Sequence, residues 1–236
     1  MLLFVVATLL AAVAACVQGT VGFGLALTSA PLLALLDPAF VPGPLLVASL
    51  PLALAALARE RRHADVRGVV TAFAGRVPGT AIGALAVAVL PMLFLRVSIG
   101  LLVLLGVAVS LWAPRFDPTR RVLFGAGVIS GVTGTIAAIG GPPVALVYQH
   151  ATGPQLRATL ALYFALGTVL SVAALWLTGS FGHHEAVLSA ILVPGTAVGF
   201  LASGPVLRIV DAGRLRPLVL GAAALSAGVL LATALL

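Results

Sequence analysis

One stretch of this sequence occurs twice, as Val77-Pro-Gly-Thr-Ala-Ile-Gly83 and again as Val193-Pro-Gly-Thr-Ala-Val-Gly199. Six of the seven residues are identical, at an offset of 116 residues. A second pair lies upstream, where Gly19-Thr-Val-Gly22 aligns with Gly131-Val-Thr-Gly134 at an offset of 112. Two matches in the same order and at nearly the same offset indicate an internal duplication. We therefore predict two related halves, residues 1–112 and 113–236.

The composition places both halves in a membrane. Of the 236 residues, 61% are hydrophobic and only 8% are charged, whereas a soluble domain carries about 25% charged residues. Successive apolar segments come close to the roughly 20 residues that a helix needs to cross a bilayer. The net charge of +7 does not indicate nucleic-acid binding, because nearly all the arginines lie at segment ends and form no solvated basic face. We predict an all-α polytopic membrane protein whose surroundings are the lipid bilayer.

Six apolar segments are candidate full crossings, and each half also begins with one that is broken. Glycine, proline and polar residues interrupt residues 2–36 and residues 122–149. Such residues continue a helix poorly, and irregular backbone at membrane depth must be buried in protein or line a polar cavity. Each broken segment is therefore either one kinked crossing or a hairpin of two short helices. The six predicted crossings are residues 43–58, 68–90, 96–112, 157–178, 185–205 and 214–235.

The distribution of arginine favours hairpins. Connections 59–67, 113–121 and 206–216 each contain at least three arginines, whereas connection 179–184 contains none. Basic connections stay on the cytoplasmic side of a membrane. All three lie there only if both broken segments return to their starting side, and residues 122–130 are too few to span. We therefore predict two inverted repeats, each a broken helical hairpin followed by three transmembrane helices. The localisation expected is a bacterial inner membrane, with both termini extracytoplasmic.

Inverted repeats with discontinuous helices are typical of transporters. A broken helix leaves backbone N–H groups unpaired at a positively polarised end, and two such ends near the midplane would bind an anion. Glycines let a substrate approach the backbone, and hydroxyls add donors. The alternative is that these small residues serve only close helix packing. The predicted substrate-binding residues of the breaks are Gln18, Gly19, Thr20, Gly22 and Gly24, with Ser130, Gly131, Thr133, Gly134, Thr135, Gly140 and Gly141.

One arginine lies within a predicted crossing. Arg76 is about eight residues inside the segment 68–90, and its counterpart in the repeat is Leu192. An ionisable residue within the membrane is a candidate functional group. The alternative is that its long side chain reaches the cytoplasmic interface, roughly 12 Å away.

No acidic residue lies in the middle of a predicted crossing, which disfavours obligatory proton coupling. The stretch His183-His184-Glu185 is a poor coordination shell because its residues are adjacent, so we predict no metal site and no cofactor. The single Cys16 excludes an intramolecular disulfide. No nucleophile–base pair is found in the membrane segments, and we do not expect an enzyme.

The ordered motifs resemble the sulfite exporter TauE/SafE family. The resemblance rests on Gln18-Gly-Thr-Val-Gly-Phe-Gly24 with Pro31, on Gly131-Val-Thr-Gly134 leading to Gly140-Gly-Pro-Pro143 and Tyr148, and on Leu156-Arg-Ala-Thr159. It covers nearly the whole chain in the same order. It implies a permease for sulfite, sulfonates or related organic anions, and it adds Arg157 and Thr159 to the candidate site. Arg76 rests on the physical argument above.

The leading hypothesis is therefore a transporter that exports a small anion by alternating access, without obligatory proton coupling. An ion-coupled uptake permease for a sulfonate or a carboxylate is the alternative transporter. A membrane scaffold that transports nothing is the alternative from another class. Because the chain is small for a transporter, a homodimer is among the partners considered.

Overall fold

The computed structural model describes residues 2–21, 24–112, 117–209 and 212–235. These residues form ten α-helices and two short 3-10 turns, and no strand occurs among them. The first five helices are α1 (Leu2–Val21), α2 (Leu25–Leu36), α3 (Gly43–Glu60), α4 (Val66–Val89) and α5 (Met92–Trp112). The other five are α6 (Arg120–Ala137), α7 (Gly141–Val147), α8 (Gly153–Leu177), α9 (His183–Ile209) and α10 (Ala212–Leu235).

The chain is a multi-pass membrane protein by the length and composition of its helices. Within the described residues, seven helical segments are long and apolar enough to cross a bilayer, and they belong to α1, α3, α4, α5, α8, α9 and α10. Each of the six predicted crossings corresponds to one of these long helices, which confirms the all-helical prediction. Large apolar side chains are exposed along them, such as Leu9, Leu105 and Leu201, as expected for surfaces that face lipid.

The chain breaks after α1 and after α6. Gly24 precedes α2 with a φ of 124°, a conformation that glycine adopts without steric cost. In the second half the break is at Ala138, which has a φ of 59°. Thr133 supports this break, because its hydroxyl donates a hydrogen bond of 2.7 Å to the carbonyl oxygen of Ile139.

The prediction that residues 122–130 form a short arm is wrong. The helix α6 continues through Ser130, Gly131 and Gly134 to Ala137 and has 18 residues. Gly131 lies against the backbone of α4, where an added Cβ would come within 2.6 Å of the Arg76 carbonyl oxygen. Close packing of this kind compensates the low helix propensity of glycine.

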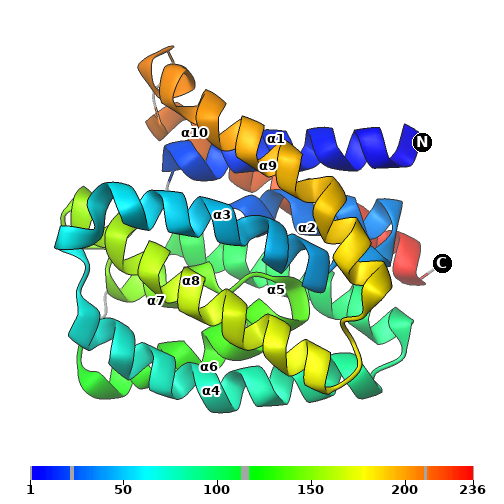
Figure 1. The fold of residues 1–236 in the computed structure, drawn as a ribbon, viewed down its shortest axis with the longest axis horizontal. Coiled ribbons are helices and arrows are strands. Elements are labelled where there is room, and N and C mark those ends of the chain that lie inside the picture. The colour runs from blue at the N-terminus through cyan, green and yellow to red at the C-terminus, as the bar shows by residue number, and fades with distance from the viewer. Residues whose placement is uncertain (1, 22–23, 113–116, 210–211, 236) are drawn as a thin grey trace.

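The first helix of each predicted half packs along a helix of the other half. The helix α6 packs along α4, and α1 packs along α9. The pairs α3–α8 and α5–α10 also join the two halves. Close approach is made through glycines, because a Cβ on Gly127 would overlap the carbonyl oxygen of Ala72 and one on Gly199 would overlap that of Ala12. Residues 1–112 and 113–236 are thus interleaved (Figure 1).

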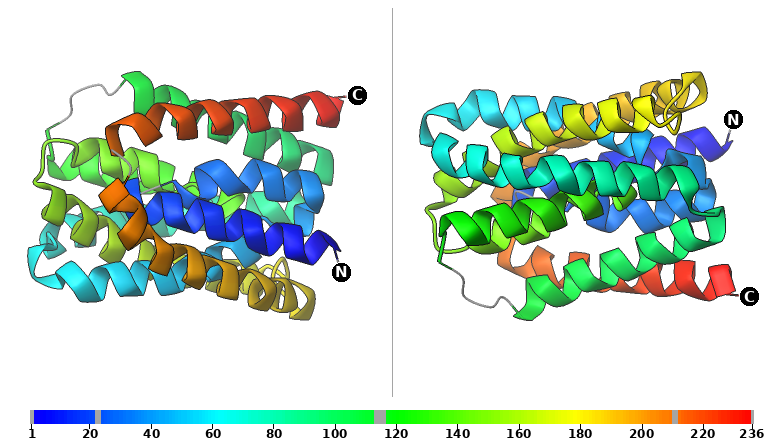
Figure 2. Two further views of the ribbon diagram at one scale, coloured as in Figure 1. Left: turned by 90° about the horizontal axis from the view of Figure 1, so that it is seen from above. Right: turned by 90° about the horizontal axis from the view of Figure 1, so that it is seen from below.

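The helices lie roughly side by side, and their ends gather at two ends of the molecule. The described chain begins and finishes at one end, where α8 also connects to α9 (Figures 1 and 2). The connection from α3 to α4, which contains Arg61 and Arg62, lies at the opposite end. In both views α1 begins and α2 finishes at the same end, so these two helices fold back on each other.

Candidate functional site

The side chain of Arg76 lies inside the protein. Arg76 is ten residues from the start of α4, a distance of about 15 Å along the helix axis. Only 2% of its surface is exposed, and it is among the largest fully buried side chains of the described chain. The structure therefore places the guanidinium among the helices, and the alternative that it reaches an interface does not hold.

Hydroxyl groups and one aromatic ring surround this guanidinium. Nη1 of Arg76 donates to Oγ of Ser130 at 3.2 Å, and Nη2 donates to Oγ of Ser171 at 3.4 Å. Ser130 in turn donates to the carbonyl oxygen of Gly140 at 2.5 Å. The Cζ of Arg76 is 5.0 Å from the centroid of the Tyr163 ring, a cation–π distance. Within the described residues no carboxylate pairs with Arg76, and its Nε is buried without a partner.

Three glycines make the slot that holds the guanidinium. A Cβ on Gly167 of α8 would overlap the Cζ of Arg76. A Cβ on Gly134 or Gly140 would lie 3.0 or 3.1 Å from Nη2 or Nη1. These positions need glycine because a longer side chain would occupy the place of the charge.

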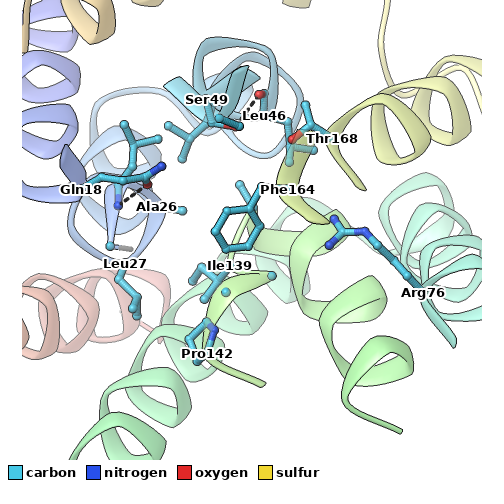
Figure 3. Close-up of a pocket in the computed structure, with 17 residues that line it drawn as sticks. Gln18, Ala26, Leu27, Leu46, Ser49, Arg76, Ile139, Pro142, Phe164 and Thr168 are labelled. Carbon is cyan, nitrogen blue, oxygen red and sulfur yellow. Dashed lines mark hydrogen bonds between the residues drawn. The ribbon is translucent and has the colours of Figure 1, made fainter. Parts of the chain in front are cut away.

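Arg76 faces a cavity between the two chain breaks. The cavity has a volume of about 50 Å³. Gln18 and Gly24 line it from the first break, and Gly140 and Gly141 line it from the second. Ser49 of α3 and Thr168 of α8 add hydroxyl groups, and most of the remaining wall is apolar, including Leu27, Leu46, Ile139, Pro142 and Phe164 (Figure 3).

The first break presents amide groups to this cavity. The side-chain carbonyl of Gln18 accepts a hydrogen bond of 3.1 Å from the backbone N–H of Leu25, at the start of α2. Figure 3 shows the side-chain nitrogen of Gln18 directed toward the cavity, with Arg76 on the far side and the Phe164 ring between them in this view. The N–H groups of Ala26 and Leu27 belong to the first turn of α2, where helix geometry provides no acceptor. This end of the cavity is therefore positively polarised.

The second break differs from the first in its donors. Pro142 and Pro143 stand in the first turn of α7 and have no N–H group. Of the two predicted helix ends, the first therefore has more backbone N–H donors in its first turn. The guanidinium of Arg76 lies beside this second break and brings a positive charge to it. Its counterpart Leu192 is fully buried in an apolar cluster.

Other predicted site residues contribute to the framework. Gly19 packs against Ser203 of α9, and Gly131 packs against α4. Thr133 holds the second break, and Thr135 lies 2.9 Å from Ser171, which contacts Arg76. The side chain of Thr20 and the whole of Gly22 lie outside the described residues.

Arg157 and Thr159 lie toward the start of α8, outside the Arg76 cavity. Arg157 forms an ion pair of 2.6 Å with Glu60 of α3, and its side chain is 45% exposed. The hydroxyl of Thr159 accepts a hydrogen bond of 3.0 Å from the backbone N–H of Asp65. Arg157 lines a second cavity of about 180 Å³, together with Arg59 and Glu60.

The two cavities share three lining residues. Gln18, Ala53 and Phe164 line both of them. The second cavity therefore lies between the Arg76 cavity and the end of the molecule that carries Arg59 and Arg157.

Sequence reasoning missed several residues around Arg76. Ser171, Thr168 and Gly167 all come from α8, and Tyr163 lies one turn before Gly167. The available signal was their spacing, because small and polar residues three or four positions apart share one face of an otherwise apolar helix. Only the packing of α8 against α4 shows that this face meets Arg76.

A comparison with protein families agrees with the motifs discussed above. A model of the sulfite exporter TauE/SafE family matches residues 7–230, nearly the whole chain. Among the curated proteins and the solved structures, none matches this chain. The residues matched include both breaks, Arg76 and the helices that surround it. The chain therefore belongs to the sulfite exporter TauE/SafE family of membrane transporters.

Proposed function

We propose that this protein exports a small anion, such as sulfite or an organic sulfonate, across a bacterial inner membrane. The observation that carries the proposal is the buried guanidinium of Arg76, which faces a cavity between two broken helices and has no carboxylate partner among the described residues. Membership of the sulfite exporter family supports the same class of substrate.

The electrostatics of Arg76 favour an anion as the missing partner. A buried charge without a counter-charge is costly, and proteins pair such groups or bind an ion there. Ser130 and Ser171 solvate the guanidinium but bring no negative charge. An oxoanion in the cavity would supply that charge, and the N–H groups of α2 would stabilise it from the opposite side.

The arrangement of the helices supports inverted repeats. In the predicted repeat, α1 corresponds to α6 and α4 corresponds to α9. The contact of α1 with α9 is therefore the counterpart of the contact of α6 with α4. Arg61 and Arg62 lie at one end of the molecule, whereas the Arg-free connection between α8 and α9 lies at the other with both ends of the described chain (Figure 1). If the Arg-rich end is cytoplasmic, both termini are extracytoplasmic. The second cavity, which has Gln18, Ala53 and Phe164 in common with the Arg76 cavity, is then the cytoplasmic route to Arg76 in an alternating-access cycle.

Export of this kind does not require a proton. An inside-negative potential drives an anion outward by about 2.3 kcal/mol per charge per 100 mV. The acidic residues that the structure describes, including Glu60, Asp65 and Glu185, lie at helix ends or in connections. The lining of the Arg76 cavity contains neither carboxylate nor imidazole among the described residues.

The proposal is tested by anion flux in proteoliposomes with an imposed membrane potential. We expect wild-type protein to move sulfite or a short sulfonate, and Arg76→Gln to lower the flux at sub-saturating substrate at least tenfold, because charged hydrogen bonds contribute roughly 1.5–3 kcal/mol. Arg67→Gln is the matched control, since Arg67 is an exposed residue of the same helix. Equal flux through the two variants, or none through the wild type for sulfite, sulfonates and small carboxylates, would refute the proposal.

A further inference from the structure

A groove on the lipid-facing side of the protein is separate from the Arg76 cavity. It lies between α5, α6 and α7 and has a volume of about 380 Å³. Its walls include Leu102 and Leu105 of α5, Gly125 and Ile129 of α6, and Pro143 and Leu146 of α7. All of these side chains are apolar. The one hydroxyl in the lining, that of Thr133, is bonded to the backbone of Ile139.

The groove lies where the two predicted halves differ. The helix α2 has 12 residues and packs along α10. Its counterpart α7 has only 7 residues and covers less of α5. The groove lies beside this short helix, with Pro143 and Leu146 in its wall. Gly125 on the α6 side borders open space, because a Cβ added there would have no neighbour within 4 Å.

The dimensions of the groove suit one acyl chain. Its α6 wall is the stripe formed by Val122, Gly125, Ala126, Ile129 and Thr133. These residues recur at helical spacing and extend over about 17 Å. One leaflet of a hydrocarbon core is about 15 Å thick, so the groove is about as long as one leaflet is deep.

Positive charge stands at one end of this stripe. Arg120 and Arg121 are the first residues of α6, both are exposed, and Val122 follows them directly. The N-terminal end of α6 adds a positive dipole. Basic residues beside apolar grooves between transmembrane helices bind anionic lipid headgroups.

We propose that this groove binds an anionic phospholipid, with one acyl chain between α5, α6 and α7 and its phosphate at Arg120 and Arg121. The site is independent of the proposed anion transport, since neither arginine lines the Arg76 cavity. The paired arginines select a lipid with net negative charge over a zwitterionic lipid of equal chain length.

The test is native mass spectrometry of the purified full chain with phosphatidylglycerol and phosphatidylcholine of matched acyl chains. We expect preferential retention of phosphatidylglycerol, lowered roughly twenty-five-fold by Arg120→Gln with Arg121→Gln, since each arginine near a headgroup contributes about fivefold in binding. The matched control is Arg61→Gln with Arg62→Gln, an exposed pair away from the groove. Gly125→Leu should displace both lipids, whereas Gly228→Leu, at an exposed glycine of α10 with equal space, should not.

Several results would overturn the proposal. Equal retention of the two lipids would show that Arg120 and Arg121 do not select the headgroup. An equal loss of phosphatidylglycerol in the Arg61 and Arg62 control variant would show the same. Retention unaffected by Gly125→Leu would place the lipid elsewhere. A dimer that Gly125→Leu abolishes would show that a second copy of the chain fills the groove. Transport need not change in any of these variants, so failure here leaves the proposed function intact.

Discussion

Arg76 stands out among the arginines because its neighbours are hydroxyls, glycines and a ring. Ser130 and Ser171 accept its hydrogen bonds, and Gly167 provides its space. The repeat places Leu192 at the corresponding position, where an apolar cluster receives it. The predicted repeat thus carries this charge in one half, and the charge lies beside the break whose helix begins with prolines. At the residue scale the site is therefore asymmetric.

The two tyrosines of the chain differ in what their hydroxyls contact. Tyr148 donates a hydrogen bond of 2.8 Å to Asp65, which caps the start of α4. Burial, followed by the hydrogen bond to Asp65, raises the pKa of Tyr148 above its usual value. Tyr163 is fully buried, and its hydroxyl has no partner among the described residues.

We therefore predict opposite effects on stability for the same substitution at these two positions. Tyr148→Phe should lower the free energy of unfolding by about 1 kcal/mol, because the Asp65 carboxylate loses a donor. Tyr163→Phe should leave it unchanged or raise it, because a buried unpaired hydroxyl is removed while the ring beside Arg76 remains. Thermal unfolding in detergent at neutral pH measures both.

The pH dependence of unfolding is a further check on Tyr148. Since its folded-state pKa is raised, the difference between wild type and Tyr148→Phe should be full below the ordinary tyrosine pKa of about 10 and should shrink as the pH rises above it. Equal loss of stability in the two Phe variants would contradict this account of the hydroxyls.

At the element scale, glycine faces allow α6 and α4 to pack closely. Gly127 and Gly131 of α6 meet the backbone of α4, and Gly75 and Gly79 of α4 meet the backbone of α6. Gly195 and Gly199 play the same part between α9 and α1. The glycines of the repeated motif Val-Pro-Gly-Thr-Ala therefore bring helices together. This packing also carries Arg76 to the second break.

Replacement of two glycines on α6 should separate packing from open space. In Gly131→Ala the new Cβ would lie 2.6 Å from the Arg76 carbonyl oxygen and 2.7 Å from the Thr80 nitrogen. We expect a loss of about 1–3 kcal/mol in the free energy of unfolding, as for overpacked cores. Gly125→Ala, within the α6 stripe that lines the groove, should cost nothing by sterics because no atom lies within 4 Å of the added Cβ. Thermal unfolding of both variants measures this difference. Equal melting temperatures would show that the α4–α6 contact tolerates the added methyl group.

At the scale of the whole molecule, the arginine-rich connection after α3 and the two ends of the described chain lie at opposite ends. Arg61, Arg62 and the Arg157–Glu60 ion pair lie toward one end, on α3, the connection that follows it, and the start of α8. The described chain begins and finishes at the other end (Figure 2). A bilayer between these ends would have these arginines on one side and both termini on the opposite side.

Cysteine labelling tests the orientation of the molecule. In a Cys16→Ser background, His63→Cys and His184→Cys place single thiols at exposed positions on opposite ends of the molecule. We expect a membrane-impermeant maleimide to label His184→Cys in spheroplasts and His63→Cys only in inside-out vesicles, because arginine-rich connections stay cytoplasmic. Labelling of both thiols from the same side would exclude the inverted-repeat topology.

Much of the fold could be predicted from hydropathy, arginine positions and the repeat. Crossings such as 43–58 and 157–178 were recognisable because each is a long apolar segment with its own ends. The glycines of α6 were misleading, since a glycine that permits helix packing and a glycine that breaks a helix have the same local signature. The actual break at Ala138 depends on Thr133 and on the prolines that follow.

By itself the sequence determined that the chain is a membrane-spanning helical protein, it predicted two similar halves, and it singled out Arg76 and the two breaks. Those properties depend on hydrophobicity, chain length and charge, which are local and additive along a chain. Tertiary structure alone decided that Arg76 points inward, that Ser171, Tyr163 and Gly167 surround it, and that Gly131 serves packing. These properties depend on which helix faces which, and contacts between residues as distant as Arg76 and Ser171 leave no periodic trace in either segment.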